Sequence, residues 1–159
     1  MTPTVELLDL PTEYGAPKQP LAWPAVRREL AQAPTYWLST VRRDGRPHVV
    51  PLDGLWVDDV WFYGGSDRSV HRRTALAHPA ATMHLPDPMR AVVVEGEVRL
   101  SRPEPDLAQR LADHSNEKYA HYGLRNDASA YSEVLALYPR RVLAWTAFPK
   151  DATRFSFPG

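Results

Sequence analysis

Short apolar runs, each bounded by polar or turn-forming residues, recur through the first half of the chain and predict β-strands. YWLSTV (36–41) and PHVVPL (47–52) flank the turn RRDGR, which contains Asp44-Gly45. Asp-Gly is typical of tight hairpins, because glycine readily adopts the positive φ that such turns need. LWV (55–57) and VWFYG (60–64) follow across Asp58-Asp59. The pattern predicts four consecutive strands in an antiparallel meander.

Further apolar runs predict the rest of the sheet. ATMHL (81–85) precedes the long run AVVVEGEVRL (91–100), in which alternate positions face opposite sides and Gly96 indicates a bulge or a close backbone contact. SEVLALYPRRVLAWTAF (132–148) predicts a last pair of strands. In TRFSF (153–157), Phe155 and Phe157 alternate with polar neighbours, which predicts one more strand.

Three segments have helical character. Pro24 lies in the first turn of a predicted helix from about residue 23 to 33, in which Val26 and Leu30 are four positions apart. A second helix is expected at about 69–78, and a third within 104–122, with Pro105 in its first turn. Helices that only flank a β core predict a mainly β (α+β) fold, a small antiparallel barrel.

Length and composition favour a single domain over residues 1–159, with residues 1–20 as an extended, proline-containing arm that wraps a surface or a partner subunit. Nineteen basic residues balance nineteen acidic ones, which argues against nucleic-acid or membrane binding driven by overall charge. There is no cysteine, so disulfides and thiolate sites are excluded. Without a signal sequence or a membrane-length apolar run, we expect a soluble, cytoplasmic protein.

The stretch WFYGGSDRSVHRR (61–73) carries the strongest functional signal. It places two glycines and several hydrogen-bond donors between a strand and the start of a helix. Glycine lets the backbone approach a ligand, and N–H groups at a helix start bind anions. The stretch therefore predicts a phosphate site built by Gly65, Ser66, Arg68, Ser69 and Arg72. The alternative is an ordinary capped helix with a solvated arginine face.

Other candidate features carry less information. Trp56 follows Asp53-Gly54 and would suit the face of a planar heterocycle, although filling the core is the more common role of a tryptophan. Acidic residues and histidines on the third helix are typical of a solvated face, so we expect no metal site. The sequence contains no hydrolase, Walker or dinucleotide-binding motif. Any chemistry is therefore expected to come from a bound cofactor.

The run from Tyr36 to Leu100, with RVLAW and ATRFSF near the end, resembles the pyridoxamine 5'-phosphate oxidase-like split β-barrel family. The likeness is greatest to its flavin/deazaflavin oxidoreductase branch. The resemblance implies a split barrel and a homodimer, with FMN or coenzyme F420 bound between the protomers. Pyridoxamine 5'-phosphate oxidases proper have a further C-terminal substrate segment, which is not found after Ala144. The compact chain is more similar to the F420-using branch.

The resemblance also implies roles for individual residues. Ser66, Arg68 and Ser69 match positions that hold the cofactor phosphate, whereas His71 stands where a lysine is usual. Pro51, Leu52 and Trp56 match positions beside the ring. Because histidine is only partly protonated near neutral pH, the phosphate is expected to bind more weakly or to depend on Arg72.

The resemblance thus implies an oxidoreductase in which reduced F420 gives a hydride to a small unsaturated organic substrate, with no side-chain acid or base identified. One alternative is an FMN-dependent oxidoreductase of the same family. Another is a non-catalytic flavin- or haem-binding protein, with His48 or His84 as a haem ligand. A nucleic-acid-binding barrel is disfavoured by the neutral overall charge.

Overall fold

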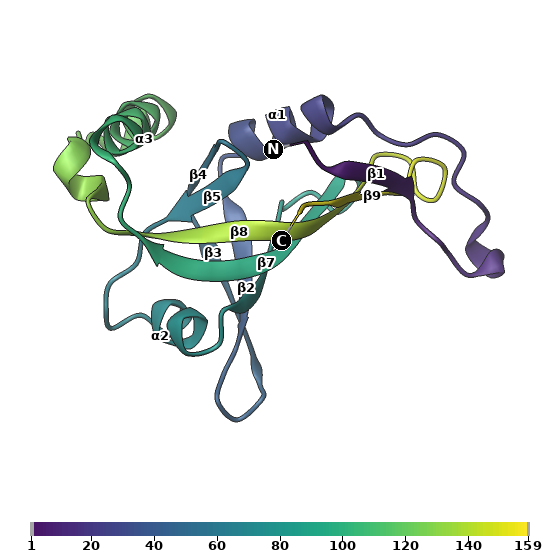
Figure 1. The fold of residues 1–159 in the computed structure, drawn as a ribbon, viewed down its shortest axis with the longest axis horizontal. Coiled ribbons are helices and arrows are strands. Elements are labelled where there is room, and N and C mark those ends of the chain that lie inside the picture. Colours follow the sequence, from purple (N-terminus) through teal and green to yellow (C-terminus); the bar gives the residue numbers. More distant parts are fainter. Residues whose placement is uncertain (1, 159) are drawn as a thin grey trace.

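The computed structural model describes residues 2–158, which form an antiparallel sheet of nine strands with helices on its outside (Figure 1). Strand order is β1-β9-β8-β7-β6-β2-β3, and the β4–β5 hairpin joins the sheet through β8. The strands are β1 Thr4–Leu7, β2 Tyr36–Val41, β3 Pro47–Leu52, β4 Leu55–Val57, β5 Val60–Tyr63, β6 Ala80–His84, β7 Ala91–Ser101, β8 Val134–Trp145 and β9 Thr153–Ser156. The sheet curls without closing, as expected of a split barrel.

The predicted hairpin of β2 and β3 is confirmed, with Tyr36 opposite Leu52 and a positive φ of 83° at Gly45. The predicted continuation of the meander is wrong. Within residues 2–158, β4 pairs with β5 alone, and β5 continues to β8 rather than returning to β3. The meander is interrupted at Gly54, whose N–H donates a hydrogen bond to the hydroxyl of Tyr119, in the segment after α3. This contact directs β4 away from β3, and the missing β3–β4 pairing leaves the barrel open.

The pair of strands predicted near the C-terminus is also wrong, because Val134–Trp145 is one twelve-residue strand. The register against β7 shifts after Glu95, so that Glu95 faces Arg141 and Gly96 faces Pro139. This confirms the bulge predicted at Gly96, where an added Cβ would lie 2.1 Å from the Tyr138 carbonyl oxygen. Pro139 lacks an N–H and is tolerated at the irregular position, so the strand does not break.

The three predicted helices are confirmed as α1 Trp23–Gln32, α2 Val70–Ala77 and α3 Pro105–Lys118. Short 3-10 turns occur at η1 Thr12–Tyr14, η2 Ala120–Tyr122 and η3 Ala128–Tyr131. Helix α2 packs against β2, β3 and β7, whereas α3 lies over β4 and η3 (Figure 1). Within residues 2–158, no helix is long and apolar enough to span a membrane.

Two hydrophobic cores meet at β5, because successive side chains of a strand point to opposite faces. Trp61 and Tyr63 point into the barrel core, together with Trp23, Leu38 and Phe155. Phe62 points the other way, into a smaller core shared with α3. The strand that leads into the glycine loop therefore has the barrel on one side and α3 on the other.

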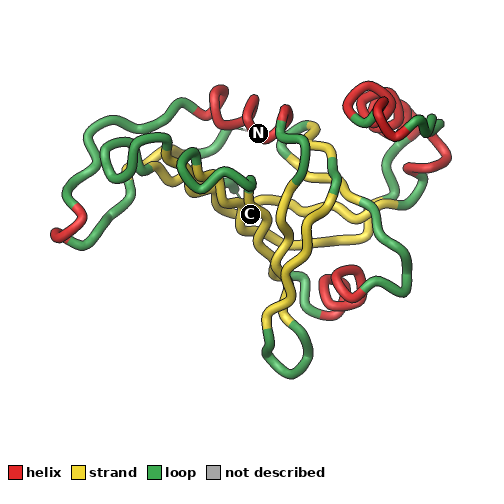
Figure 2. Tube along the Cα trace, turned by 180° about the vertical axis from the view of Figure 1, so that it is seen from behind, coloured by secondary structure: helices red, strands yellow, loops and turns green. Residues whose placement is uncertain are grey.

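The N-terminal segment contains a strand that the sequence pattern did not predict. Thr4–Leu7 pairs with β9, and the chain then loops through η1 before reaching α1 (Figure 2). All four residues of β1 are exposed, which explains why they show no buried alternation. Contact of this arm with a partner subunit stays a prediction.

Candidate functional site

The loop of residues 64–69 joins the end of β5 to α2, as the sequence predicted. At Gly65 φ is 155°, and an added Cβ would lie 2.4 Å from Cε1 of His71, so only glycine fits. The carbonyl of Ser66 accepts hydrogen bonds from the Ser69 backbone N–H at 2.8 Å and from the Ser69 hydroxyl at 2.7 Å. The loop is therefore a defined turn that brings Gly65, Ser66, Arg68 and Ser69 together.

The start of α2 has no side-chain cap, because the hydroxyl of Ser69 is directed back to Ser66. The N–H groups of the first turn consequently keep their capacity to donate to an anion. The hydroxyl of Ser66 accepts from the Arg68 N–H at 3.2 Å, and the Arg68 residue itself is exposed. The loop thus places uncapped N–H groups, a serine hydroxyl and one exposed guanidinium close together; that they bind an anion stays a prediction.

His71 does not supply the positive charge of a lysine. Its residue is only 6% exposed, and its ring packs against Tyr63 with centroids 5.9 Å apart. Burial, followed by the nearby His48 and Arg72, lowers the pKa of His71 below its usual value. Within residues 2–158, Nδ1 of His71 has no hydrogen-bond partner. At neutral pH this side chain is a buried neutral group beneath the loop.

Arg72 is already engaged by carboxylates. Its Nε lies 2.9 Å from Asp67, and its Nη2 lies 3.3 Å from Glu133, which also pairs with Arg102. The Arg72 side chain is 14% exposed, so the pairing with Glu133 across the fold holds it in place. Arg72 adds little net positive charge to the loop, and Arg68 is left as the main cationic donor among the predicted residues.

The remaining predicted residues are not gathered in one place. Pro51 is on the outer face of β3 opposite Trp37, whereas Leu52 faces the barrel core. Trp56 is 4% exposed and packs edge-on against Trp23, which is the core-filling role. Helix α2, which follows the loop, packs against β3, the strand that carries Pro51.

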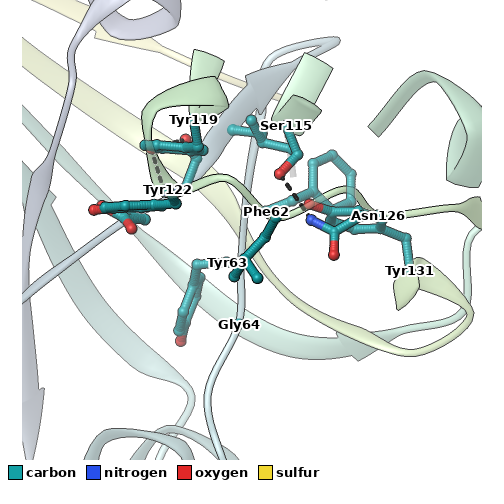
Figure 3. Close-up of a pocket in the computed structure, with 12 residues that line it drawn as sticks. Phe62, Tyr63, Gly64, Ser115, Tyr119, Tyr122, Asn126 and Tyr131 are labelled. Carbon is teal, nitrogen blue, oxygen red and sulfur yellow. Dashed lines mark hydrogen bonds between the residues drawn. The ribbon is translucent and has the colours of Figure 1, made fainter. Parts of the chain in front are cut away.

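A cavity of about 200 Å³ between α3 and the β4–β5 hairpin was not anticipated from the sequence (Figure 3). We call it the tyrosine pocket; its lining includes Tyr119, Tyr122, Tyr131, Phe62, Ser115 and Asn126. A second cavity of about 290 Å³ shares Tyr63, Gly64, Asn126 and Tyr131 with it and reaches Gly65 and Arg72. The only sequence signal was the frequency of tyrosines after α3, which does not reveal what they surround.

Gly54 fixes the inner wall of the tyrosine pocket. Its N–H donates to the Tyr119 hydroxyl at 2.9 Å, and its carbonyl accepts from Nζ of Lys118 at 2.9 Å. Nζ of Lys118 also donates to the Tyr36 hydroxyl at 2.8 Å and lies 4.7 Å from the centre of that ring. Burial lowers the pKa of Lys118 to about 8 and raises that of Tyr119 to about 12.

Comparison with known proteins gives a consistent result for the fold. Residues 22–146 match the family model described as pyridoxamine 5'-phosphate oxidase. A conserved hypothetical protein from Mycobacterium tuberculosis superposes with a TM-score of 0.65 at 19% identity, covering 79% of this chain and 84% of that one. No curated protein matches the sequence.

Two further solved structures are similar and differ in what their names describe. An F420 reductase is 26% identical over 72% of this chain and 94% of its own, with a TM-score of 0.54. A heme binding protein from Mycobacterium smegmatis is 20% identical, with a TM-score of 0.64, over 84% of this chain and 58% of its own. The fold is thus shared by proteins with different ligands.

Proposed function

The chain belongs to the pyridoxamine 5'-phosphate oxidase family, and from this we propose that it is an oxidoreductase that uses coenzyme F420. In the proposed reaction a hydride passes to a small unsaturated organic substrate. Among the solved structures, the F420 reductase at 26% identity supports this choice of cofactor. The proposal does not include pyridoxamine phosphate oxidation.

The observation that carries the proposal is the charge of the 64–69 loop. His71 is buried with a lowered pKa, and Arg72 is paired with two carboxylates. This leaves Arg68, the Ser66 hydroxyl and the uncapped N–H groups of α2, since the Ser69 hydroxyl already donates to the Ser66 carbonyl. A phosphate monoester such as that of FMN carries about −1.5 to −2 at neutral pH. The F420 tail phosphate is a diester with a single charge, which one guanidinium and neutral donors match better.

In this proposal the chain's own residues bind and orient the cofactor. Ser66, Arg68 and Ser69 hold the phosphate, and Pro51 on neighbouring β3 lies along the ring. Bound F420 supplies the hydride from its central ring. The protein excludes water from the ring and adds hydrogen-bond donors near the acceptor. No side chain is assigned as a general acid or base.

We further propose that the protein is a homodimer through the outer face of the sheet. The registers of β3, β2, β6, β7 and β8 align Pro51, Trp37, His84, Val93 and Leu143 in one row across five strands. Trp37 is 36% exposed and stacks on His84, and Val49 nearby is 50% exposed. An apolar row of this kind favours burial against a second copy. Pro51 would then bring the cofactor ring to the interface.

A non-catalytic binding protein is the second candidate, and the haem-binding structure from Mycobacterium smegmatis favours it. His84 bonds the Leu85 carbonyl through Nδ1 at 2.9 Å, which leaves Nε2 for a ligand. Haem binding that is lost in a His84→Ala variant would support this candidate. A protein that binds F420 but reduces no unsaturated acceptor would support it as well.

The deciding experiment is a fluorescence titration of the purified protein with F420 and with FMN. We expect F420 to bind more tightly, and Arg68→Ala to weaken it about tenfold or more, because a hydrogen bond to a charged group contributes roughly 1.5–3 kcal/mol. Ser69→Ala should weaken it less, and Arg43→Ala in the β2–β3 turn is the matched arginine control. Unchanged affinity in both loop variants, or tighter FMN binding, would refute the proposal.

A further inference from the structure

The lining of the tyrosine pocket combines aromatic and aliphatic residues with Asp53 and with a polar pair, Ser115 and Asn126 (Figure 3). Nδ2 of Asn126 donates to the Ser115 hydroxyl at 3.3 Å, and Ser115 is 7% exposed. Within residues 2–158, the Ser115 hydroxyl hydrogen has no acceptor and Oδ1 of Asn126 has no donor. The pocket therefore presents one unused donor beside one unused acceptor, on the buried Ser115 and the half-buried Asn126.

This polar pair is held in position by the surrounding structure. The side chain of Asn116 bonds both backbone groups of Asn126, accepting from its N–H at 2.7 Å and donating to its carbonyl at 2.8 Å. The opposite wall is fixed by the Tyr119 hydroxyl on Gly54. The rings of Tyr119 and Tyr122 are parallel within 8°, with centroids 5.8 Å apart. A pre-organised site of this kind loses little entropy when a ligand binds.

We propose that the tyrosine pocket binds a small planar ring that carries a carboxamide or lactam edge. The ring contacts Tyr122 and Phe62, and the edge pairs with the polar groups. The ligand N–H donates to Oδ1 of Asn126, and the ligand carbonyl accepts from the Ser115 hydroxyl. A volume of about 200 Å³ suits one or two fused rings, below the size of most drug-like sites. None of Ser66, Arg68 and Ser69 contributes, so this site does not depend on the proposed function.

The test uses benzamide as the probe and, for comparison, acetophenone, a compound of similar shape that lacks the N–H donor. Saturation-transfer NMR on the full chain should show both rings bound, with benzamide about fivefold tighter, the effect of one neutral hydrogen bond. Asn126→Ala removes the acceptor but keeps the backbone bonds to Asn116, so it should abolish that preference. Equal affinities of the two compounds for the unmodified protein would overturn the proposal.

A filling variant tests the location independently. An added Cβ at Gly64 meets no atom within 4 Å, and Gly64 lacks a positive φ, so Gly64→Leu should fold and block the pocket. Gln109→Ala, on a part of α3 that does not line the pocket, is the control and should bind benzamide normally. Unchanged benzamide binding by a folded Gly64→Leu variant would refute the location. Because F420 titration is a separate measurement, failure here is distinguishable from failure of the proposed function.

Discussion

Replacing Gly54 by alanine should destabilise the protein far more than the same change at Gly64. An alanine Cβ at position 54 would lie 2.2 Å from Nε1 and 2.7 Å from Cε2 of Trp61, a side chain with no exposed surface. It would also lie 3.0 Å from the carbonyl oxygen of Phe62. Neither the fully buried indole nor the strand backbone moves easily, so the backbone of residue 54 must shift.

The magnitude follows from two contributions. Overpacking a well-packed core costs about 1–3 kcal/mol. The shift also disturbs the bonds from the Gly54 peptide to Tyr119 and Lys118, and a buried group left unpaired costs about 1–3 kcal/mol. We therefore expect Gly54→Ala to lower the free energy of unfolding by roughly 2–6 kcal/mol, out of about 5–15 kcal/mol for a typical domain.

Urea denaturation followed by tryptophan fluorescence measures this difference directly. Gly64→Ala is the matched control, because a Cβ there meets no atom within 4 Å. Its unfolding free energy should stay within about 0.5 kcal/mol of the unmodified value. If Gly54→Ala lowers the unfolding free energy by less than about 1 kcal/mol, the backbone at residue 54 can shift away from Trp61 at little cost. The account of how β4 is led away from β3 would then fail.

Three further predictions address charge and assembly. Asp67→Asn removes one of the two carboxylates that pair with Arg72. Because Asp67 is largely exposed, the affinity for FMN should rise only about two- to fivefold. An unchanged affinity in a titration would contradict the idea that these carboxylates neutralise Arg72. Lys118 has a pKa of about 8 when folded against 10.5 ordinarily, so the unfolded chain binds more protons between these values and stability should rise with pH there. In urea denaturation, the unfolding free energy of the unmodified protein should rise by about 1 kcal/mol relative to that of Lys118→Met between pH 7.5 and 9.5, after allowance for solvent screening. A difference between the two proteins that does not change with pH would refute burial of the amine. Trp37→Glu should shift the mass in light scattering from dimer to monomer, whereas Arg99→Glu on the exposed end of β7 should not.

Local patterns were sufficient for elements whose partners are close in sequence. The β2–β3 hairpin follows from the Asp44-Gly45 turn, and α1 follows from the spacing of Val26 and Leu30. The break between β3 and β4 did not follow, because it depends on Tyr119, 65 residues beyond Gly54. Similarly, the continuity of β8 through Pro139 depends on the bulge at Gly96 of another strand.

In the candidate site, too, the features set by neighbouring residues could be predicted, and those set by distant residues could not. The glycine turn and the uncapped start of α2 are local features, and the sequence predicted their position. The neutral state of His71 depends on burial under the barrel, and the compensation of Arg72 depends on Glu133. Neither is visible from residues 64–73 alone. Histidine in place of the usual lysine suggested weaker phosphate binding, and the burial and pairing seen here give that expectation a physical cause.

The two proposed sites are linked by the alternation of side chains along β5. Tyr63 points into the barrel and packs on His71 beneath the loop, whereas Phe62 points outward and forms a wall of the tyrosine pocket. Gly64 then follows both and borders the pocket and the adjoining cavity that reaches Arg72. Since one short strand serves both sites, a ligand that shifts the β5 backbone at Phe62 also shifts the adjoining Gly64 and Gly65. Benzamide should therefore change F420 affinity, and by linkage F420 should change benzamide affinity by the same factor.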